Sequence, residues 1–374
     1  MYRYLNLDYR KWSKKTTQTF DLFRNITSRR SSLAVKMQSK PTTIKEIARL
    51  LNISPSSVSR GLHDHPSIGA VTREKIKQLA KSLNYEPNNA AILFQKGKTY
   101  TIGVILPELS EHFFSTAISA IEDEALKKNY TVIFAQSHDD YDQEVKLVEK
   151  MKNQRVDGLL VSISKDTSKF DHFEKLNSFN IPVVFFDRIP PFKNVHYVAC
   201  SLESATVKAI NYLLKKGHRS IGMINGPTTL FASDERKDGY MQAITFNRLK
   251  FDPSSIVNCD LTEKGTIEAA NQFLNHKRKP TAIVAFNDYV ALFLIKYFKK
   301  LNVINDFDIV SYANLPIISY IDHSPVASVE QYPYLQGQKA ANILLDLMNS
   351  PNSENQAFYN TIVESDLIVN EGKD

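Results

Sequence analysis

The sequence predicts a mixed α/β protein: a small three-helix domain near the N-terminus, followed by two Rossmann-like lobes built on parallel sheets. Two observations lead to this fold class. A stretch of twenty residues beginning at Thr43 encodes two short helices with a tight connector. From Thr101 onward, short runs rich in β-branched residues alternate with helical stretches, as in a doubly wound sheet. The length of 374 residues exceeds what one hydrophobic core supports, so two or three domains are expected.

The first of these stretches reads TIKEIARLLNISPSSVSRGL and contains the start signals of two helices. Thr43 and Glu46 have capping-box spacing, which predicts that the first helix begins there. Ser54 offers an N-cap oxygen, and Pro55 suits the first position of the second helix because its missing N–H costs nothing there. Val58 is the only apolar residue in the first two turns of that helix. The side chains expected on its exposed face are therefore Pro55, Ser56, Ser57, Ser59 and Arg60.

This arrangement predicts a helix-turn-helix, in which the first helix packs and the second enters the DNA major groove. An ordinary helical hairpin is the alternative for the stretch alone. A third amphipathic helix is expected from Thr72 to Leu83, with Ile76 and Ala80 among its inward residues. The runs TTIKEIARLLNISPSSVSRGL, TREKI and LNYEPN, in this order and spacing, resemble the N-terminal domain of the LacI/GalR transcription regulators.

The resemblance implies a homodimer that binds a double-stranded DNA operator, with Ser56 and Arg60 at base edges and Ser57 and Ser59 nearer the backbone. Residues 42–86 would form the DNA-binding domain, and residues 87–98 a hinge helix and linker. In the family a hinge Leu wedges between base pairs, and Phe94 holds that position here. A linker that packs on the next domain is the alternative. The expected DNA contacts are Thr43, Ser54, Pro55, Ser56, Ser57, Ser59, Arg60, Asn88, Ala91 and Phe94.

Positive charge is concentrated at the N-terminal end of the chain. Residues 1–41 hold ten Lys and Arg against two acids, and residues 42–98 hold nine against four, so the rest carries −6 of the net +7. A basic head on an acidic body is expected when only the head meets phosphates. Residues 1–41, which include Trp12, could be a disordered basic arm, a transit peptide or sequence upstream of the true start. We favour a start at Met37, where proteins of the family usually begin.

The remaining residues, 99–374, are expected to form the ligand-binding and dimerisation core. Lobe 1 is predicted over about 99–198 plus 327–348, and lobe 2 over about 199–326. This layout resembles periplasmic sugar-binding proteins and the LacI/GalR core. The strands expected, in chain order, begin at Thr101, Thr131, Gly158, Pro182, Tyr197, Ser220, Ile256, Thr281, Ile309 and Ala327.

Ligands in such sheets lie beyond the carboxyl ends of the strands. There, His112 and the aromatic residues after it could stack on a sugar or instead staple the helix to the sheet. Polar residues that end strands could bind hydroxyl groups or cap the next helix. The resemblance implies that Arg236, three residues before a Gly, forks onto ligand oxygens. The expected ligand contacts are His112, Phe113, Phe114, Asp187, Arg236, Asn287, Asp288 and Asn314.

One position departs from the family pattern. Tyr312 is followed by Ala313 and Asn314, where the family frequently has Asp after the aromatic residue. A usual acceptor for ligand hydroxyls is therefore missing. The local charge shifts toward positive, and this favours a sugar or sugar derivative with an anionic group over a neutral sugar.

Enzyme motifs are absent from the sequence: it has no phosphate-binding loop, dinucleotide fingerprint, zinc-protease motif or nucleophile elbow. Cys200 and Cys259 match no metal-ligand spacing, and no apolar run reaches the ~18 residues of a membrane span. We therefore expect no catalytic activity, no cofactor, no bound metal and no membrane association. The protein is expected to be a cytoplasmic, effector-controlled regulator that represses transcription. The alternatives are a solute-binding protein and a regulator controlled by a protein co-regulator without a metabolite.

Overall fold

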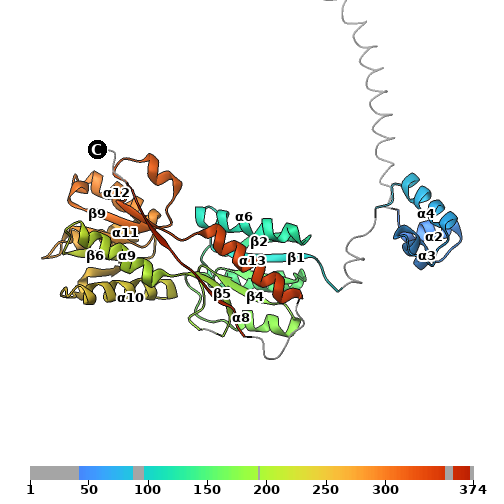
Figure 1. Cartoon of the computed structure of the whole chain (residues 1–374), viewed down its shortest axis with the longest axis horizontal. Coiled ribbons are helices and arrows are strands. Elements are labelled where there is room, and N and C mark those ends of the chain that lie inside the picture. The colour runs from blue at the N-terminus through green and yellow to red at the C-terminus, as the bar shows by residue number, and fades with distance from the viewer. Residues whose placement is uncertain (1–41, 87–96, 193, 350–356, 371–374) are drawn as a thin grey trace, which may run out of the picture. The chain divides into compact units, whose positions relative to one another are not determined.

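The computed structural model describes residues 42–86, 97–192, 194–349 and 357–370, in two compact units divided between Lys96 and Gly97 (Figure 1). Each unit is described by itself. The predicted N-terminal extension and the expected hinge contacts Asn88, Ala91 and Phe94 lie outside the described residues.

The described residues of the first unit, 42–86, form a three-helix domain, as the sequence predicts. Its helices are α2 (Ile44–Leu51), α3 (Pro55–Leu62) and α4 (Ala70–Ser82). The Thr43 hydroxyl caps α2 by accepting from the backbone N–H of Glu46 at 3.3 Å. Asn52 ends α2 in the left-handed conformation with φ 51°, which turns the chain into α3. The predicted start of α4 is two residues late, because Gly69 precedes that helix without a side-chain cap.

Gly61 of α3 faces Ile76 of α4 in the core of this unit. A Cβ at Gly61 would lie 2.4 Å from Cδ1 of Ile76, which no ordinary contact allows. Ile76, Ile47 and Val58 have no exposed surface and form the centre of this small core. Leu50 of α2 is 51% exposed. Since α3 buries only Val58 and Gly61, its remaining surface is available for contact with another molecule.

Lobe 1 of the second unit is a six-stranded sheet in the order β11-β5-β4-β3-β1-β2, with every neighbouring pair parallel. Helices α6 and α13 cover one face, and α7 and α8 cover the other. Its elements are β1 (Thr101–Leu106), α6 (His112–Lys127), β2 (Thr131–Gln136), α7 (Tyr141–Asn153), β3 (Gly158–Val161), α8 (Asp171–Glu174), a 3₁₀ turn (Lys175–Phe179), β4 (Val183–Phe186), β5 (His196–Cys200), α13 (Pro333–Asn349) and β11 (Asn360–Val363).

Lobe 2 has the strand order β12-β10-β9-β8-β6-β7, in which β12 is antiparallel to β10 and the other neighbouring pairs are parallel. Helices α9 and α10 cover one face and α11 and α12 the other. Its elements are α9 (Leu202–Lys215), β6 (Ile221–Asn225), α10 (Phe231–Phe246), β7 (Ile256–Asn258), α11 (Glu263–Leu274), β8 (Ala282–Ala285), α12 (Asp288–Lys300), β9 (Asp308–Tyr312), β10 (Ala327–Glu330), β12 (Asp366–Val369) and 3₁₀ turns at Pro253–Ser255, Ile304–Asp306 and Pro316–Tyr320.

The C-terminal part of the chain corrects the predicted lobe limits. The strand β10 was placed in lobe 1, but it pairs in parallel with β9 of lobe 2. Two strands that the sequence does not predict, β11 and β12, join opposite lobes and are drawn in red in Figure 1. As a result the chain crosses between the lobes three times, near Ser201, Gln331 and Glu364.

Helices α6 and α13 lie side by side on lobe 1 (Figure 1). A Cβ at Gly337 of α13 would lie 2.3 Å from the backbone oxygen of Ala117 in α6. Backbone cannot move aside as a side chain can, so Gly337 is required for this approach. Helix α6 begins beside the ends of β1 and β4, and α13 follows the second crossover. The close packing therefore joins these two regions of the core.

Candidate DNA-binding face and interlobe site

The N-terminal end of α3 presents an ordered group of hydroxyls. The Ser54 hydroxyl caps α3 by accepting from the N–H of Ser57 at 3.1 Å. It also lies 2.8 Å from the Ser56 hydroxyl and 2.9 Å from that of Ser57. Pro55, Ser56 and Arg60 are exposed, and Ser57 and Ser59 are half-buried. The predicted face is therefore present, although Ser57 and Ser59 have less free surface than Ser56.

Most of the predicted ligand residues of the core lie at the carboxyl ends of strands or the starts of helices where the two lobes meet. Asp187 directly follows β4 and has a left-handed backbone with φ 60°. Its carboxylate lies 3.5 Å from the Ser162 hydroxyl. Burial raises the pKa of Asp187 to about 6, against the opposing effect of the Arg188 and Arg236 charges. This carboxyl group of lobe 1 therefore senses a charge in lobe 2.

Arg188, the polar neighbour of Asp187 at the end of β4, is a functional candidate that is not among the expected ligand contacts. It is 8% exposed, and its guanidinium donates to Asp139 at 2.5 Å. A second nitrogen lies 3.9 Å from Glu111, and the guanidinium carbon is 5.8 Å from the ring centre of Phe114. The surrounding carboxylates raise its pKa despite its burial. The Asp187-Arg188 pair in the sequence could have suggested it, but its partners are remote in the chain.

Arg236 of α10 occupies the corresponding place in lobe 2. Its guanidinium lies between two aromatic rings, 4.1 Å from the centre of Phe286 and 4.4 Å from that of Tyr312. The side chain is 4% exposed, and one nitrogen donates to the Ala232 carbonyl at 3.1 Å. Burial lowers its pKa, while Asp187 and Glu235 act in the opposite direction. These contacts lie within lobe 2, and the ligand role of Arg236 stays a prediction.

Three buried polar atoms of lobe 2 have no hydrogen-bond partner among the residues that the structure describes. They are Nε of Arg236, Oδ1 of Asn225 and Oγ of Ser233. Asn225 ends β6 and donates through its amide nitrogen to the Ser233 carbonyl at 2.9 Å. Buried polar atoms normally have partners, so these atoms require water or a ligand. The sequence analysis missed Asn225 and Ser233.

Asp288 corrects the predicted ligand set. It is fully buried, and both carboxylate oxygens accept hydrogen bonds within lobe 2. The donors are the Leu315 N–H at 2.7 Å, the Ser328 hydroxyl at 2.9 Å and the Ser311 hydroxyl. Burial raises its pKa. Asp288 therefore holds β9 and β10 to the start of α12, and we assign it a structural role.

Two more predicted aromatic contacts belong to the core instead. Phe114 is 1% exposed and Phe113 is 8% exposed, and their rings meet edge to face at 5.4 Å. They staple α6 to the sheet, the alternative that the sequence left open. His112 is exposed, and its side chain lies 3.4 Å from the Thr116 hydroxyl. Burial raises the pKa of Tyr289 in lobe 2 and the His112 backbone acts in the opposite direction, so the two lobes come near each other at this edge.

The last two predicted contacts have partners within lobe 2. Asn287 caps α12 through its Oδ1, which accepts from the Val290 N–H at 3.0 Å. Asn314 donates to Glu330 at 2.9 Å and has a left-handed backbone with φ 47°. Both side chains are partly exposed, so each retains surface that a ligand could reach.

Within the described ranges, no three His, Cys, Asp or Glu side chains lie close enough together to hold a metal ion. Cys200 and Cys259 are buried free thiols. No helix in the described part of the chain is long and apolar enough to cross a membrane.

Comparison with known proteins gives two matching family models. The model described as "Bacterial regulatory proteins, lacI family" matches residues 43–88, and "Periplasmic binding proteins and sugar binding domain of LacI family" matches residues 99–368. Catabolite control protein A of Priestia megaterium is 31% identical over 310 residues, or 82% of this chain and 92% of that protein. The PurR repressor of Vibrio atlanticus is 27% identical, covering 84% and 95%. The lac repressor dimer bound to operator and the anti-inducer ONPF has a TM-score of 0.72 and 25% identity, covering 88% and 98%.

Proposed function

The chain belongs to the LacI family and is an effector-controlled, DNA-binding transcriptional regulator, and we propose that α3 reads its operator while Asp187, Arg188 and Arg236 bind its effector. We propose that the protein is a repressor and that it binds double-stranded DNA as a homodimer. Because its target is the chromosome, we propose that it works in the cytoplasm at the nucleoid.

The observation that carries the DNA-reading proposal is the limited burial of α3. Only Val58 and Gly61 of this helix are buried, and the exposed N-terminal end carries Ser56 held against Ser54. Arg60 is exposed one turn further on. A guanidinium can donate to both major-groove acceptors of guanine, and a hydroxyl can bond to either kind of base edge. The hinge residues Asn88, Ala91 and Phe94 remain proposed minor-groove contacts.

Selection of genomic fragments with the full-length protein tests the DNA-reading proposal. We expect a small set of related sequences, protected as two half-sites about one helical turn or a multiple of it apart. Ser56→Ala should change the preference at one base position in each half-site. Arg49→Ala, which removes an exposed charge from α2, is the matched control. Recovery of unrelated fragments with equal affinity would show non-specific binding and contradict the proposal.

A sugar or sugar derivative is the proposed effector. The interlobe groups named above include two guanidinium groups, Arg188 and Arg236, and three carboxyl groups, Asp139, Glu111 and Asp187. The preference for an anionic ligand, inferred from Ala313, assumed an excess of positive charge at the site. The carboxylates beside Arg188 remove that excess, so they no longer support this preference. Paired acceptors and fixed guanidinium donors suit neutral hydroxyl groups, and we propose a neutral sugar.

Calorimetry against neutral sugars, uronic acids and sugar phosphates tests the effector class. A neutral sugar should bind, and Arg236→Ala should abolish the heat because a buried donor is lost. Lys237→Ala removes the neighbouring exposed charge and is the control. Preference for a uronic acid or a phosphate would contradict the neutral class, and full binding by Arg236→Ala would remove this residue from the site.

The junction between core and linker offers a route from effector to DNA. Thr99 and Tyr100 donate their backbone N–H groups to the Asp157 carboxylate, each at 2.8 Å. Lys98 donates to Asn349, at the end of α13, at 3.1 Å. Since α13 begins directly after the second crossover, we propose that movement between the lobes shifts this helix and the linker held at its end. An effector acts in this way only if it binds one arrangement of the lobes more tightly.

A further inference from the structure

The loop after β3 forms hydrogen bonds to lobe 2 through Lys165. The backbone N–H of Lys165 donates to Asp139 within lobe 1 at 3.0 Å. Its carbonyl oxygen accepts from the Thr229 hydroxyl, in the loop after β6. Its ammonium group donates to the Asp260 carbonyl, in the loop after β7, at 3.3 Å. Lys165 therefore connects one loop of lobe 1 to two loops of lobe 2.

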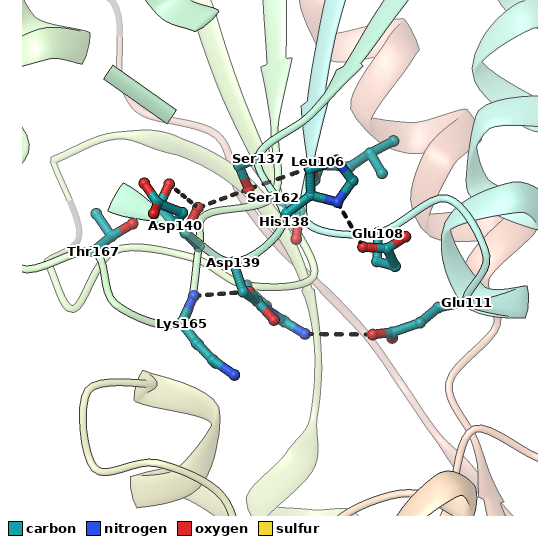
Figure 2. Close-up of polar contacts among 12 residues, drawn as sticks. Leu106, Glu108, Glu111, Ser137, His138, Asp139, Asp140, Ser162, Lys165 and Thr167 are labelled. Atoms are coloured by element: carbon teal, nitrogen blue, oxygen red, sulfur yellow. Dashed lines mark hydrogen bonds and ion pairs between the residues drawn. The ribbon is translucent and has the colours of Figure 1, made fainter. Parts of the chain in front are cut away.

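This loop is held rigidly by buried groups of lobe 1. Glu144 has no exposed surface, and its carboxylate accepts from the Ser164 N–H at 2.7 Å and from the Thr167 hydroxyl at 2.9 Å. The Ser164 hydroxyl donates to that of Ser137 at 2.7 Å. In Figure 2 the Lys165 side chain extends away from Ser137 and Asp140. A loop fixed before contact loses little conformational freedom when it meets its partner, so each interlobe hydrogen bond retains more of its free energy.

The same loop is connected to the interlobe site. Oδ1 of Asp139 accepts both the Lys165 N–H and a nitrogen of Arg188. A nitrogen of Arg188 in turn lies 3.9 Å from a carboxylate oxygen of Glu111. A ligand that pulls Arg188 or Asp139 toward itself therefore acts on the atom that positions Lys165.

We propose that the loop around Lys165 is a latch that holds the lobes closed without a ligand and whose strength sets the effector affinity. The effect on effector affinity rests on the proposed function, whereas the interlobe contacts of Lys165 do not. If only part of the population is closed, the apparent affinity falls by that fraction, so a latch outside the ligand contacts regulates the site. Its charge also suits its place, because Lys165 is among the groups that lower the pKa of Asp260.

The latch can be tested with the full-length protein by measuring the distance between spin labels on the two lobes. Gln143→Cys in α7 and Lys264→Cys in α11 place labels on exposed positions of opposite lobes. The native thiols, Cys200 and Cys259, are buried at 2% and 7% exposure. The unsubstituted chain carried through the labelling reaction measures any reaction at them. Without added ligand, the labelled parent should show one dominant distance between the two labels, shorter than that in the latch variants.

Two latch substitutions remove one interlobe bond each. Lys165→Ala removes the ammonium contact but keeps the carbonyl, and Thr229→Val removes the hydroxyl with little change of shape. Each should raise the ratio of open to closed molecules about fivefold, the ratio that one ordinary hydrogen bond supports. Lys169→Ala and Thr228→Val are matched controls, because both side chains are exposed neighbours in the same loops.

A longer or broader distance distribution in both latch variants, with both controls unchanged, would support the proposal. Unchanged distributions in the latch variants, or a parent that is already mostly open, would overturn it. Melting temperatures of the latch variants should fall by no more than about 2–4 °C and those of the controls should not change, which separates loss of the latch from loss of folding. Operator binding is measured separately, so a failed latch leaves the proposed DNA reading standing, and a failed DNA assay leaves the latch result valid.

Discussion

Replacing Asp288 separates a structural carboxylate from a ligand-binding one. Asp288→Ala leaves three buried donors without their acceptor: the Leu315 N–H and the hydroxyls of Ser311 and Ser328. The two serine oxygens are already 3.5 Å apart and can partly satisfy each other. One backbone N–H and one hydroxyl then remain unsatisfied, at about 1–3 kcal/mol each. We therefore expect the core to lose about 2–6 kcal/mol of unfolding free energy.

Differential scanning calorimetry of the full-length protein checks this expectation. For a unit of this size about 1 kcal/mol shifts the melting temperature by about 2–4 °C, so the core transition should fall by about 10 °C. Asp288→Asn keeps one acceptor oxygen and should fall between the parent and the alanine variant. Asp306→Ala removes an exposed acidic residue from the same lobe and should melt like the parent. A stable Asp288→Ala protein that has lost effector binding would refute the structural assignment and restore the ligand role.

Four further predictions follow from other parts of the chain. Arg60→Ala should cost about 1–3 kcal/mol at the selected operator and relax one base position; equal loss on random DNA would mean a phosphate contact only. Phe94→Ala should reduce operator bending in a circular-permutation gel, because unstacking loses its inserted ring; an unchanged bend would favour the linker alternative. Gly337→Ala should lower the core melting temperature by several degrees, because its Cβ meets backbone; an unchanged temperature would show that α6 and α13 can separate. Effector affinity should fall as pH drops through about 6 and Asp187 protonates, since a ligand hydroxyl donates best to the carboxylate; an equal fall in Asp187→Asn would assign the titration to another group.

Protonation of Asp187 should also affect folding stability, in the direction opposite to its effect on effector affinity. Burial raises its pKa in the folded protein above the unfolded value, so the folded state binds the proton more readily between the two values. The penalty for burying the charged form is present above about 6 and is relieved as the pH falls toward the unfolded pKa. Acid should therefore weaken effector binding while this one group favours folding. Asp187→Asn should remove both effects.

Local signals were sufficient to predict the first unit and most strand positions. Thr43 and Ser54 each cap a helix whose first turn lies within three residues, so sequence neighbours decide the geometry. Strands buried on both faces appear as short apolar runs, because helices cover each side of the sheet. The exceptions are β11 and β12, whose exposed residues leave only a weak apolar pattern, including Ile362 at 47% and Val369 at 46% exposure.

The interlobe site was predicted less well because its chemistry depends on partners that are remote in sequence. A polar residue at a strand end can meet a ligand or its own fold, and local pattern does not distinguish the two. Asp288 takes its donors from Ser311 and Ser328, 23 and 40 positions away. Arg188 is neutralised by Asp139, 49 positions earlier. Whether a carboxylate or guanidinium is free therefore depends on which loops the two sheets bring together, and the charge of the site follows from that pairing.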